Sequence, residues 1–158
     1  MELNKEQALN RASGLCVKSE HCESDIRLKL RQWSITPDDA DDRIQQLKKH
    51  KFIDEQRYAR AFVREKSKFN KWGEIKIKHA LYAKGIDEET INEALEENIN
   101  KEDEAEHLAA LLRNKRKSIK DDDKLAVRVK LIRFAAGRGY SMDQISKALK
   151  EVIKTAER

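Results

Sequence analysis

Apolar residues recur with helical spacing along most of this chain. The clearest case is a stretch from about Asp54 to Asn70. Its apolar face is made of five residues: Tyr58, Ala59, Phe62, Val63 and Phe69. Its basic residues fall on the opposite stripe or beside it: Arg57, Arg64 and Lys68, with Arg60 next to them. The pattern predicts an amphipathic helix that turns its apolar face to a core.

Two further helices follow this one. The first carries four apolar positions, Ile75, Ile77, Ala80 and Leu81. Gly85 is well placed to end it, since glycine readily takes the left-handed conformation found after helix ends. The next helix begins at Asp87, whose side chain can cap it, and buries Ile91 and Leu95.

The end of this three-helix pattern occurs three times. Lys84-Gly85-Ile86-Asp87 matches Trp33-Ser34-Ile35-Thr36 before it and Arg138-Gly139-Tyr140-Ser141 after it. In each copy an apolar residue precedes a capping side chain, and further apolar positions follow five and nine residues later. The copies lie 51 and then 54 residues apart. We therefore expect internal repeats rather than one irregular helical domain.

The predicted fold is all-α, with three tandem three-helix repeats that form an elongated, curved helical array. The expected ranges are 1–53, 54–98 and 101–158. An acidic stretch from Glu96 to Glu106 joins the second and third repeats, with Asn98 and Asn100 as helix breakers. The polar tract from Asn114 to Asp123 is expected to be the most mobile connection.

Composition narrows the class of protein further. The chain has 158 residues, of which 39% are apolar and 40% charged, and a single proline with five glycines disfavours a β sandwich or barrel. No stretch approaches the roughly 20 apolar residues of a membrane span, and Met1 leads into a charged helix pattern rather than an apolar signal segment. Two cysteines make no disulfide framework. We expect a cytoplasmic protein.

Charge is segregated along the sequence although the net charge is only +5. Residues 57–84 contain nine Lys or Arg and two Glu, 87–106 ten acidic residues and one Lys, and 113–138 ten Lys or Arg and three Asp. The blocks indicate either a polyanionic or acidic partner, or solvated helix faces with local ion pairs. A sequence-specific DNA reader is disfavoured, because the helix after Gly85 starts with carboxylates that would face phosphate.

Catalytic signatures are not found in the sequence: it has no glycine-rich phosphate loop, no Gly-x-Ser-x-Gly and no His-Glu-x-x-His. Cys16, His21 and Cys22 lack the paired spacing of a zinc site, so no metal and no cofactor is expected. Trp33 and Trp72 either pack between helices or contact a partner, and the choice is closest for Trp72, which lies in a short basic turn.

The run Phe52-Ile53-Asp54-Glu55-Gln56-Arg57-Tyr58-Ala59-Arg60-Ala61-Phe62 resembles the signature stretch of the RecX family, bacterial regulators of the RecA recombinase. The segment from Trp72 to Lys78, with Lys84-Gly85-Ile86, continues the resemblance. Upstream, residues 25–30 fit the family's acidic-apolar-x-x-Lys-Leu segment, and residues 133–149 fit its last repeat. Cys22 stands where the family commonly has Ser, and residues 113–123 match no family motif.

The resemblance implies a non-enzymatic protein that binds the RecA filament on single-stranded DNA and restrains strand exchange and ATP hydrolysis by RecA. Separately, we expect a monomer. We expect it to lie in the filament groove and to meet acidic protein surface or nearby phosphate. The alternative is a nucleic-acid-binding helical module that acts without RecA. The candidate contact residues are Arg57, Arg60, Arg64, Lys68, Lys71, Trp72, Lys76, Lys78, Lys84, Lys124, Arg128, Lys130, Arg133 and Arg138.

Overall fold

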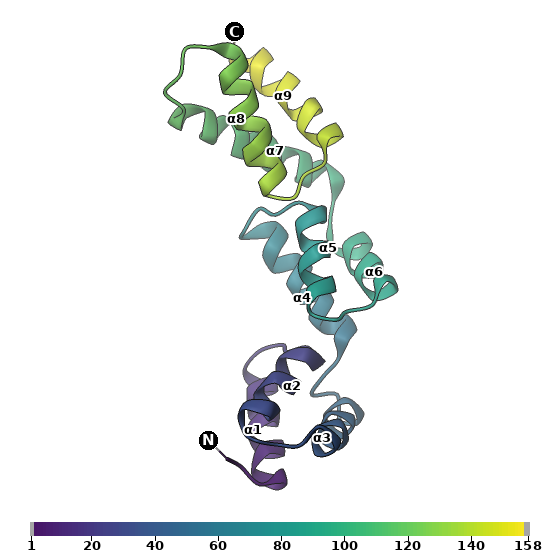
Figure 1. The fold of residues 1–158 in the computed structure, drawn as a ribbon. Helices are drawn as coiled ribbons and strands as arrows, with labels where there is room; N and C mark the ends of the chain where they lie inside the picture. The colour runs from purple at the N-terminus through teal and green to yellow at the C-terminus, as the bar shows by residue number, and fades with distance from the viewer. Residues whose placement is uncertain (1, 157–158) are drawn as a thin grey trace. The chain divides into compact units, whose positions relative to one another are not determined.

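A computed structural model describes residues 2–156, and within this range the chain forms nine α-helices and no strand (Figure 1). The helices are α1 (Lys5–Lys18), α2 (Glu23–Gln32), α3 (Pro37–Lys49), α4 (Glu55–Lys68), α5 (Glu74–Ala83), α6 (Glu88–Asn98), α7 (Lys101–Ser118), α8 (Lys124–Gly137) and α9 (Met142–Ala156). The predicted all-helical fold class is confirmed.

Local capping explains where several helices begin. The Asn4 side chain accepts a hydrogen bond from the Gln7 amide, and the Asn4 amide in turn donates to the Gln7 side-chain oxygen. Ser141 and Gln144 form the same reciprocal pair at the start of α9. Asp87 accepts a bond from the Thr90 amide before α6. These side chains satisfy amide groups that have no partner within the helix.

The three repeated turns share one backbone geometry. Ser34, Gly85 and Gly139 all have positive φ, at 63°, 82° and 96°. After each of them, the amide of the following apolar residue donates to a carbonyl five residues earlier in the preceding helix, at 3.0, 3.1 and 3.3 Å. This is the left-handed helix ending that glycine favours. The recurrence detected in the sequence is therefore a recurrence of backbone structure, even where Ser34 replaces glycine.

The described residues divide into two compact units. The first contains residues up to Ala61 together with Leu81–Ala94, and the second contains Phe62–Ala80 together with the residues from Leu95 onward. Helices α4, α5 and α6 each contribute to both units. The three repeat ranges proposed from the sequence stay a prediction.

In the first unit, α1, α2 and α3 pack on one another around a continuous apolar core (Figure 1). Ile26, Leu30 and Ile44 are fully buried there, and Trp33 is 6% exposed. The guanidinium of Arg11 lies 5.3 Å from the Trp33 ring centroid. Trp33 thus serves packing, one of the two roles that the sequence allowed.

In the second unit, α7, α8 and α9 pack on one another around a separate core (Figure 1). Leu112, Leu131, Ile145 and Leu149 are almost entirely buried in it, and Tyr140 is 3% exposed. The core positions of α9 repeat at intervals of three and four residues, as expected for a helix with one apolar face.

Three expectations from the sequence are wrong. Phe69 lies at the end of the predicted apolar face of α4 but is 82% exposed, because the helix ends at Lys68 and the ring lies beyond its packed part. Ile75, in the first turn of α5, is 47% exposed. The expected connection over residues 114–123 is helical up to Ser118, since α7 continues and its partly buried residues include Arg116.

Candidate partner-binding surface

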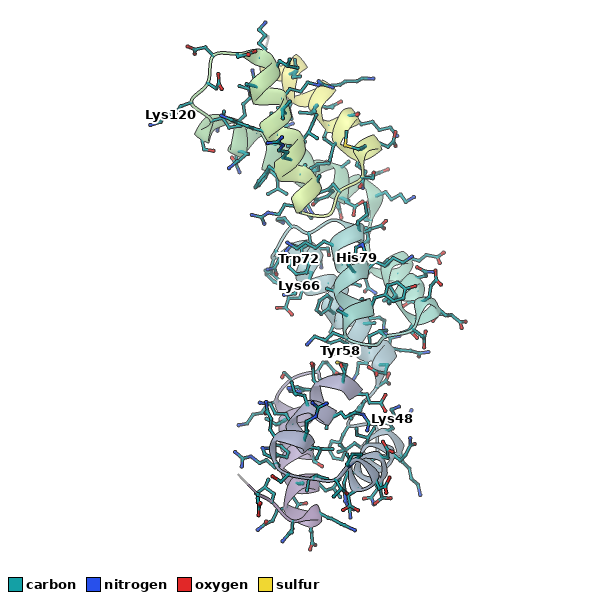
Figure 2. The ribbon with its side chains drawn as sticks, viewed as in Figure 1. Lys48, Tyr58, Lys66, Trp72, His79 and Lys120 are labelled. Atoms are coloured by element: carbon teal, nitrogen blue, oxygen red, sulfur yellow. The ribbon has the colours of Figure 1, made fainter. Side chains whose placement is uncertain are left out.

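The turn between α4 and α5 gathers aromatic and basic side chains in the second unit. Trp72 is half-buried, with the Lys66 and Lys76 ammonium groups 4.9 and 4.4 Å from its ring centroid. The Phe62 ring meets it edge-on at 6.4 Å. Figure 2 labels Trp72 and Lys66, which lie together at this turn. Cations over an indole face are attracted by its quadrupole, so the two ammonium groups are held in place near the surface.

Exposed side chains extend this cluster outward. The Phe69 ring is 82% exposed, and Lys68 beside it in the sequence is also exposed. Lys71 has a positive φ of 56°, which turns the chain sharply between the two helices. We call this set the basic turn: Lys66, Lys68, Phe69, Lys71, Trp72 and Lys76. An exposed aromatic ring in a segment with four lysines suits a partner that offers negative charge together with a flat or apolar group.

The basic turn is anchored by backbone contacts to the turn between α8 and α9. The Gly73 amide donates to the Arg138 carbonyl at 2.7 Å, and the Ile75 amide donates to the Gly139 carbonyl at 3.1 Å. A Cβ at Gly73 would lie 2.4 Å from the Gly139 carbonyl oxygen, and one at Gly139 would lie 2.4 Å from the Lys76 Cβ. Only glycine fits at either position. We call this contact of Gly73 with Gly139 the glycine joint.

Two side-chain hydrogen bonds reinforce the glycine joint. The buried Tyr140 hydroxyl donates to the Lys71 carbonyl at 2.9 Å. The Arg138 guanidinium donates to the Asn70 carbonyl at 3.1 Å and lies 5.2 Å from the Phe134 ring centroid. Arg138, a predicted contact residue, therefore also holds the basic turn in position.

Two other predicted contact residues make ion pairs within the first unit. Arg57 donates to Glu20 at 2.6 Å and to the Lys51 carbonyl at 3.0 Å. Lys84 donates to Asp25 at 2.7 Å, and this hydrogen bond raises the pKa of Lys84. Both side chains stabilise the fold, so their availability to a partner is reduced.

The remaining predicted residues differ in their surroundings. Arg64 is exposed and donates to the Asn98 side chain at 3.2 Å, and Lys130 pairs with Asp121 at 3.6 Å. Arg60 and Lys78 are half-buried. All four predicted residues within α8 are exposed: Lys124, Arg128, Lys130 and Arg133. The structure brings Lys68, Lys71, Trp72 and Lys76 together in one turn, and the role of all the predicted residues in binding stays a prediction.

One carboxylate is buried beside these elements. Glu104 in α7 is 7% exposed, accepts a hydrogen bond from Gln144, and has no partner for its Oε2 atom. Burial, and then the charge of Glu74, raise the pKa of Glu104. Glu104 lines an open groove along α7 and α9 together with Ile75, Leu108 and Ala148. A buried carboxylate of this kind favours the protonated form.

The described residues hold neither a cluster of metal ligands nor a membrane-spanning helix. Among residues 2–156, no group of three or more His, Cys, Asp or Glu side chains is arranged to hold a metal ion. Cys22 is buried at the start of α2 and Cys16 is half-buried, both as free thiols. Burial is the main cause that raises the pKa of each thiol. None of the described helices is long and apolar enough to cross a bilayer.

Sequence reasoning missed two members of the basic turn. Phe69 was assigned to a core because it shares the helical spacing of Phe62, and only the position of the helix end places it outside. Lys66 was not singled out, although its place six residues before Trp72 in a Lys-rich segment could have indicated a contact across the turn.

Family models match two parts of the chain. A model described as the second three-helix domain of RecX matches residues 54–95, and one described as the third three-helix domain of RecX matches residues 102–149. The first match contains the whole of the basic turn. Gly73 lies in the first match and Gly139 in the second.

Several relatives named regulatory protein RecX are similar to this chain. The one from Clostridium acetobutylicum is 34% identical over 149 residues, which is 92% of this chain and 69% of that protein. The one from Clostridium botulinum is 35% identical over 133 residues, 83% of this chain and 61% of that protein. The one from Chlorobium phaeobacteroides is 27% identical over 154 residues, 98% of this chain and 99% of that protein. The chain thus spans about two thirds of these clostridial relatives.

Two solved structures are similar to this chain in fold. The crystal structure of RecX from Lactobacillus salivarius has a TM-score of 0.81 and 23% identity, covering 94% of this chain and 96% of that one. A crystal structure of a regulatory protein RecX has a TM-score of 0.85 and 22% identity, covering 92% of this chain and 73% of that one. With two domain models matched in order and relatives above 30% identity over most of its length, the chain belongs to the RecX family.

Proposed function

We propose that this chain regulates the RecA recombinase by binding RecA filaments on single-stranded DNA and restraining their strand exchange and coupled ATP hydrolysis. Membership of the RecX family carries this proposal. The basic turn supports it, because its four lysines, of which Lys66 and Lys76 hold their ammonium groups over Trp72, would suit the acidic surface or the phosphates of such a filament.

The proposed mode of binding is along the groove of the filament, with contacts to successive RecA subunits. Two modest contacts made by one protein bind far more tightly than either alone, because the second contact forms at high effective concentration. The basic turn and the exposed basic residues of α8 would provide such separate contacts. A protein held across subunits would oppose the rearrangements that strand exchange requires.

The contact residues fall into two groups in this proposal. Lys68, Lys71 and Trp72 are the main contacts, since they are at least partly exposed in the basic turn. Arg57 and Lys84 act mainly by maintaining the fold of the first unit, and Arg138 acts mainly by holding the basic turn. We further propose that the chain acts as a cytoplasmic monomer without catalysis of its own, so that the nucleotide hydrolysed belongs to RecA.

A second candidate function is direct binding of single-stranded nucleic acid without RecA. The exposed Phe69 ring beside Lys68 favours it, because bases stack on aromatic side chains while ammonium groups neutralise the neighbouring phosphates. This function predicts binding to naked single strands that weakens steeply with salt. It also predicts that Phe69→Ala lowers that binding without changing the stability of the fold, since the ring is mostly in solvent.

Co-sedimentation with RecA filaments on single-stranded DNA tests the first proposal. The test variant is Lys68→Glu with Lys71→Glu, and the matched control is Lys29→Glu with Lys49→Glu, which makes the same charge change at exposed positions of α2 and α3. We expect the test variant to need at least about ten times more protein for half-maximal co-sedimentation, a loss of about 1.4 kcal/mol. The control should stay close to the unmodified chain.

The same variants are assayed for inhibition of RecA-dependent ATP hydrolysis and for binding to the naked strand. Equal co-sedimentation and equal inhibition by the test variant would contradict a role for the basic turn. No co-sedimentation of the unmodified chain, combined with salt-sensitive binding to the naked strand, would favour the second candidate.

A further inference from the structure

A row of apolar side chains runs along α8 from its first turn to its last. The row consists of Leu125, Val129, Ile132 and Ala136, at intervals of four, three and four residues. Leu125 is 67% exposed and Val129 is 39% exposed, although both belong to a helix that buries Leu131 and Ala135 on another side. Contiguous exposed apolar side chains that are rimmed by polar residues are typical of interaction sites.

Two arginines border this row. At 100° per residue, Arg128 falls on one side of the row and Arg133 on the other, and both are exposed. Neither makes an ion pair or a side-chain hydrogen bond with another of the described residues, whereas Lys130 of the same helix pairs with Asp121. We call this surface the α8 stripe: Leu125, Arg128, Val129, Ile132, Arg133 and Ala136.

The charge of the α8 stripe is not balanced from within its helix. The segment Lys124–Gly137 contains four basic residues and no acidic residue. Asp123, which precedes it, has its side chain engaged in capping the Leu125 amide. Lys120 adds further positive charge in the loop before α8, from which it projects in Figure 2. The stripe therefore combines an apolar centre with uncompensated positive edges.

We propose that the α8 stripe docks an acidic amphipathic segment of a partner polypeptide, with apolar side chains on the row and carboxylates on the two arginines. The spacing of the row matches the i, i+4, i+7 pattern by which helical segments engage a partner. From Leu125 to Ala136 the row runs for about 16 Å, the length of three helical turns. The planar guanidinium groups can each hold a carboxylate through two parallel hydrogen bonds.

The chemistry of the stripe favours this occupant over the other anionic surfaces. A nucleic acid would use the arginines but would gain little from Leu125 and Val129, which offer no aromatic face for a base. A membrane surface calls for a wider apolar face with large side chains that insert among the lipids. Here the row ends in Ala136, and Ile132 is partly packed against the core.

Fluorescence anisotropy with the full chain and a designed peptide tests the proposal. The probe is a fluorescein-labelled amphipathic helix with leucine at i, i+4, i+7 and i+11 and glutamate beside the leucines, and its counterpart has lysine for each glutamate. We expect saturable binding of the glutamate peptide only. The paired variants Arg128→Glu with Arg133→Glu, and Leu125→Asp with Val129→Asp, should each weaken binding at least about tenfold.

A matched control separates local contact from general charge attraction. Arg113→Glu with Lys150→Glu changes the net charge as much as the arginine pair and also replaces exposed side chains of the same unit. This control should bind the peptide within about twofold of the unmodified chain. Because all replaced side chains are exposed, including Val129 at 39%, circular dichroism should report an unchanged fold.

The proposal is overturned if the glutamate peptide does not bind saturably, if the lysine peptide binds equally well, or if the control loses as much affinity as the stripe variants. Sedimentation velocity adds a further test: self-association of the chain that Leu125→Asp with Val129→Asp abolishes would assign the stripe to a second copy instead. None of these measurements contains RecA, so failure here leaves the proposed function standing, and failure of co-sedimentation leaves the stripe standing.

Discussion

Replacement of Gly73 by alanine tests the glycine joint directly. The added Cβ would lie 2.4 Å from the Gly139 carbonyl oxygen, 2.5 Å from its carbonyl carbon and 2.8 Å from the Tyr140 amide nitrogen. All three are backbone atoms, so no side-chain rotation can relieve the overlap. The two turns must move apart, and the hydrogen bonds from the Gly73 and Ile75 amides must lengthen or break.

The cost of this movement has two parts. Insertion of an extra methyl group into a closely packed contact typically costs about 1–3 kcal/mol. Loss of two backbone hydrogen bonds adds about 1 kcal/mol each. We therefore expect Gly73→Ala to lower the free energy of unfolding by about 3–5 kcal/mol, a large part of the roughly 5–15 kcal/mol that stabilises an ordinary domain.

Urea denaturation followed by far-ultraviolet circular dichroism measures this loss. Gly14→Ala is the matched control, because a Cβ at Gly14 meets nothing within 4 Å and the position lies inside α1. Alanine there should stabilise the chain by up to about 1 kcal/mol through its better helix propensity. Glycine-to-alanine replacement is thus expected to lower the free energy of unfolding at Gly73 and to raise it at Gly14.

An unchanged unfolding midpoint for Gly73→Ala would refute the reasoning about the joint. It would mean that the turns carrying Gly73 and Gly139 separate without cost, and that the close approach of their backbones does not contribute to stability. A fall in stability for Gly14→Ala of similar size would show instead that any added methyl group is harmful, which would remove the specificity of the argument.

Three further predictions concern single side chains. Ser34→Gly should raise the free energy of unfolding by about 1 kcal/mol in urea denaturation, because Ser34 has a φ of 63° that costs an L-residue energy, and a fall would contradict this. Arg57→Ala should lower it by about 2 kcal/mol through loss of the charged hydrogen bonds to Glu20 and the carbonyls, whereas no change would assign Arg57 to solvent. Glu104→Gln should raise the melting temperature at neutral pH only, because burial and the charge of Glu74 raise the pKa of Glu104. The contribution of Glu104 to stability is therefore favourable below its ordinary pKa and is lost as pH rises through the raised pKa. An equal rise of the melting temperature in acid would contradict this cause.

Local rules accounted for much of the fold. Capping at Asp87 and at Ser141 with Gln144 follows from side chains that reach amides two or three residues ahead, so short sequence motifs suffice to predict it. The left-handed turns at Gly85 and Gly139 follow from the same short-range chemistry. Helical periodicity likewise predicted buried positions such as Ile91, because one helix face meets a core.

The candidate site was less predictable, because it depends on residues distant in sequence. The glycine joint brings Gly73 next to Gly139, and no local pattern encodes that approach. Helical spacing placed Arg57 on a solvent-facing stripe, but the position of Glu20 makes it an internal ion pair. Phe69 shows the converse: its spacing fits a core, yet no other element covers it.

The glycine joint also fixes the distance at which the basic turn and α8 can contact another molecule. Because its contact is made by peptide groups, a change of side-chain rotamer alone cannot shift one turn against the other. The distance between the basic turn and α8 is therefore fixed by contacts between main-chain atoms. A molecule that touches both must present its own two patches at that interval, so selectivity can arise from spacing as well as from charge.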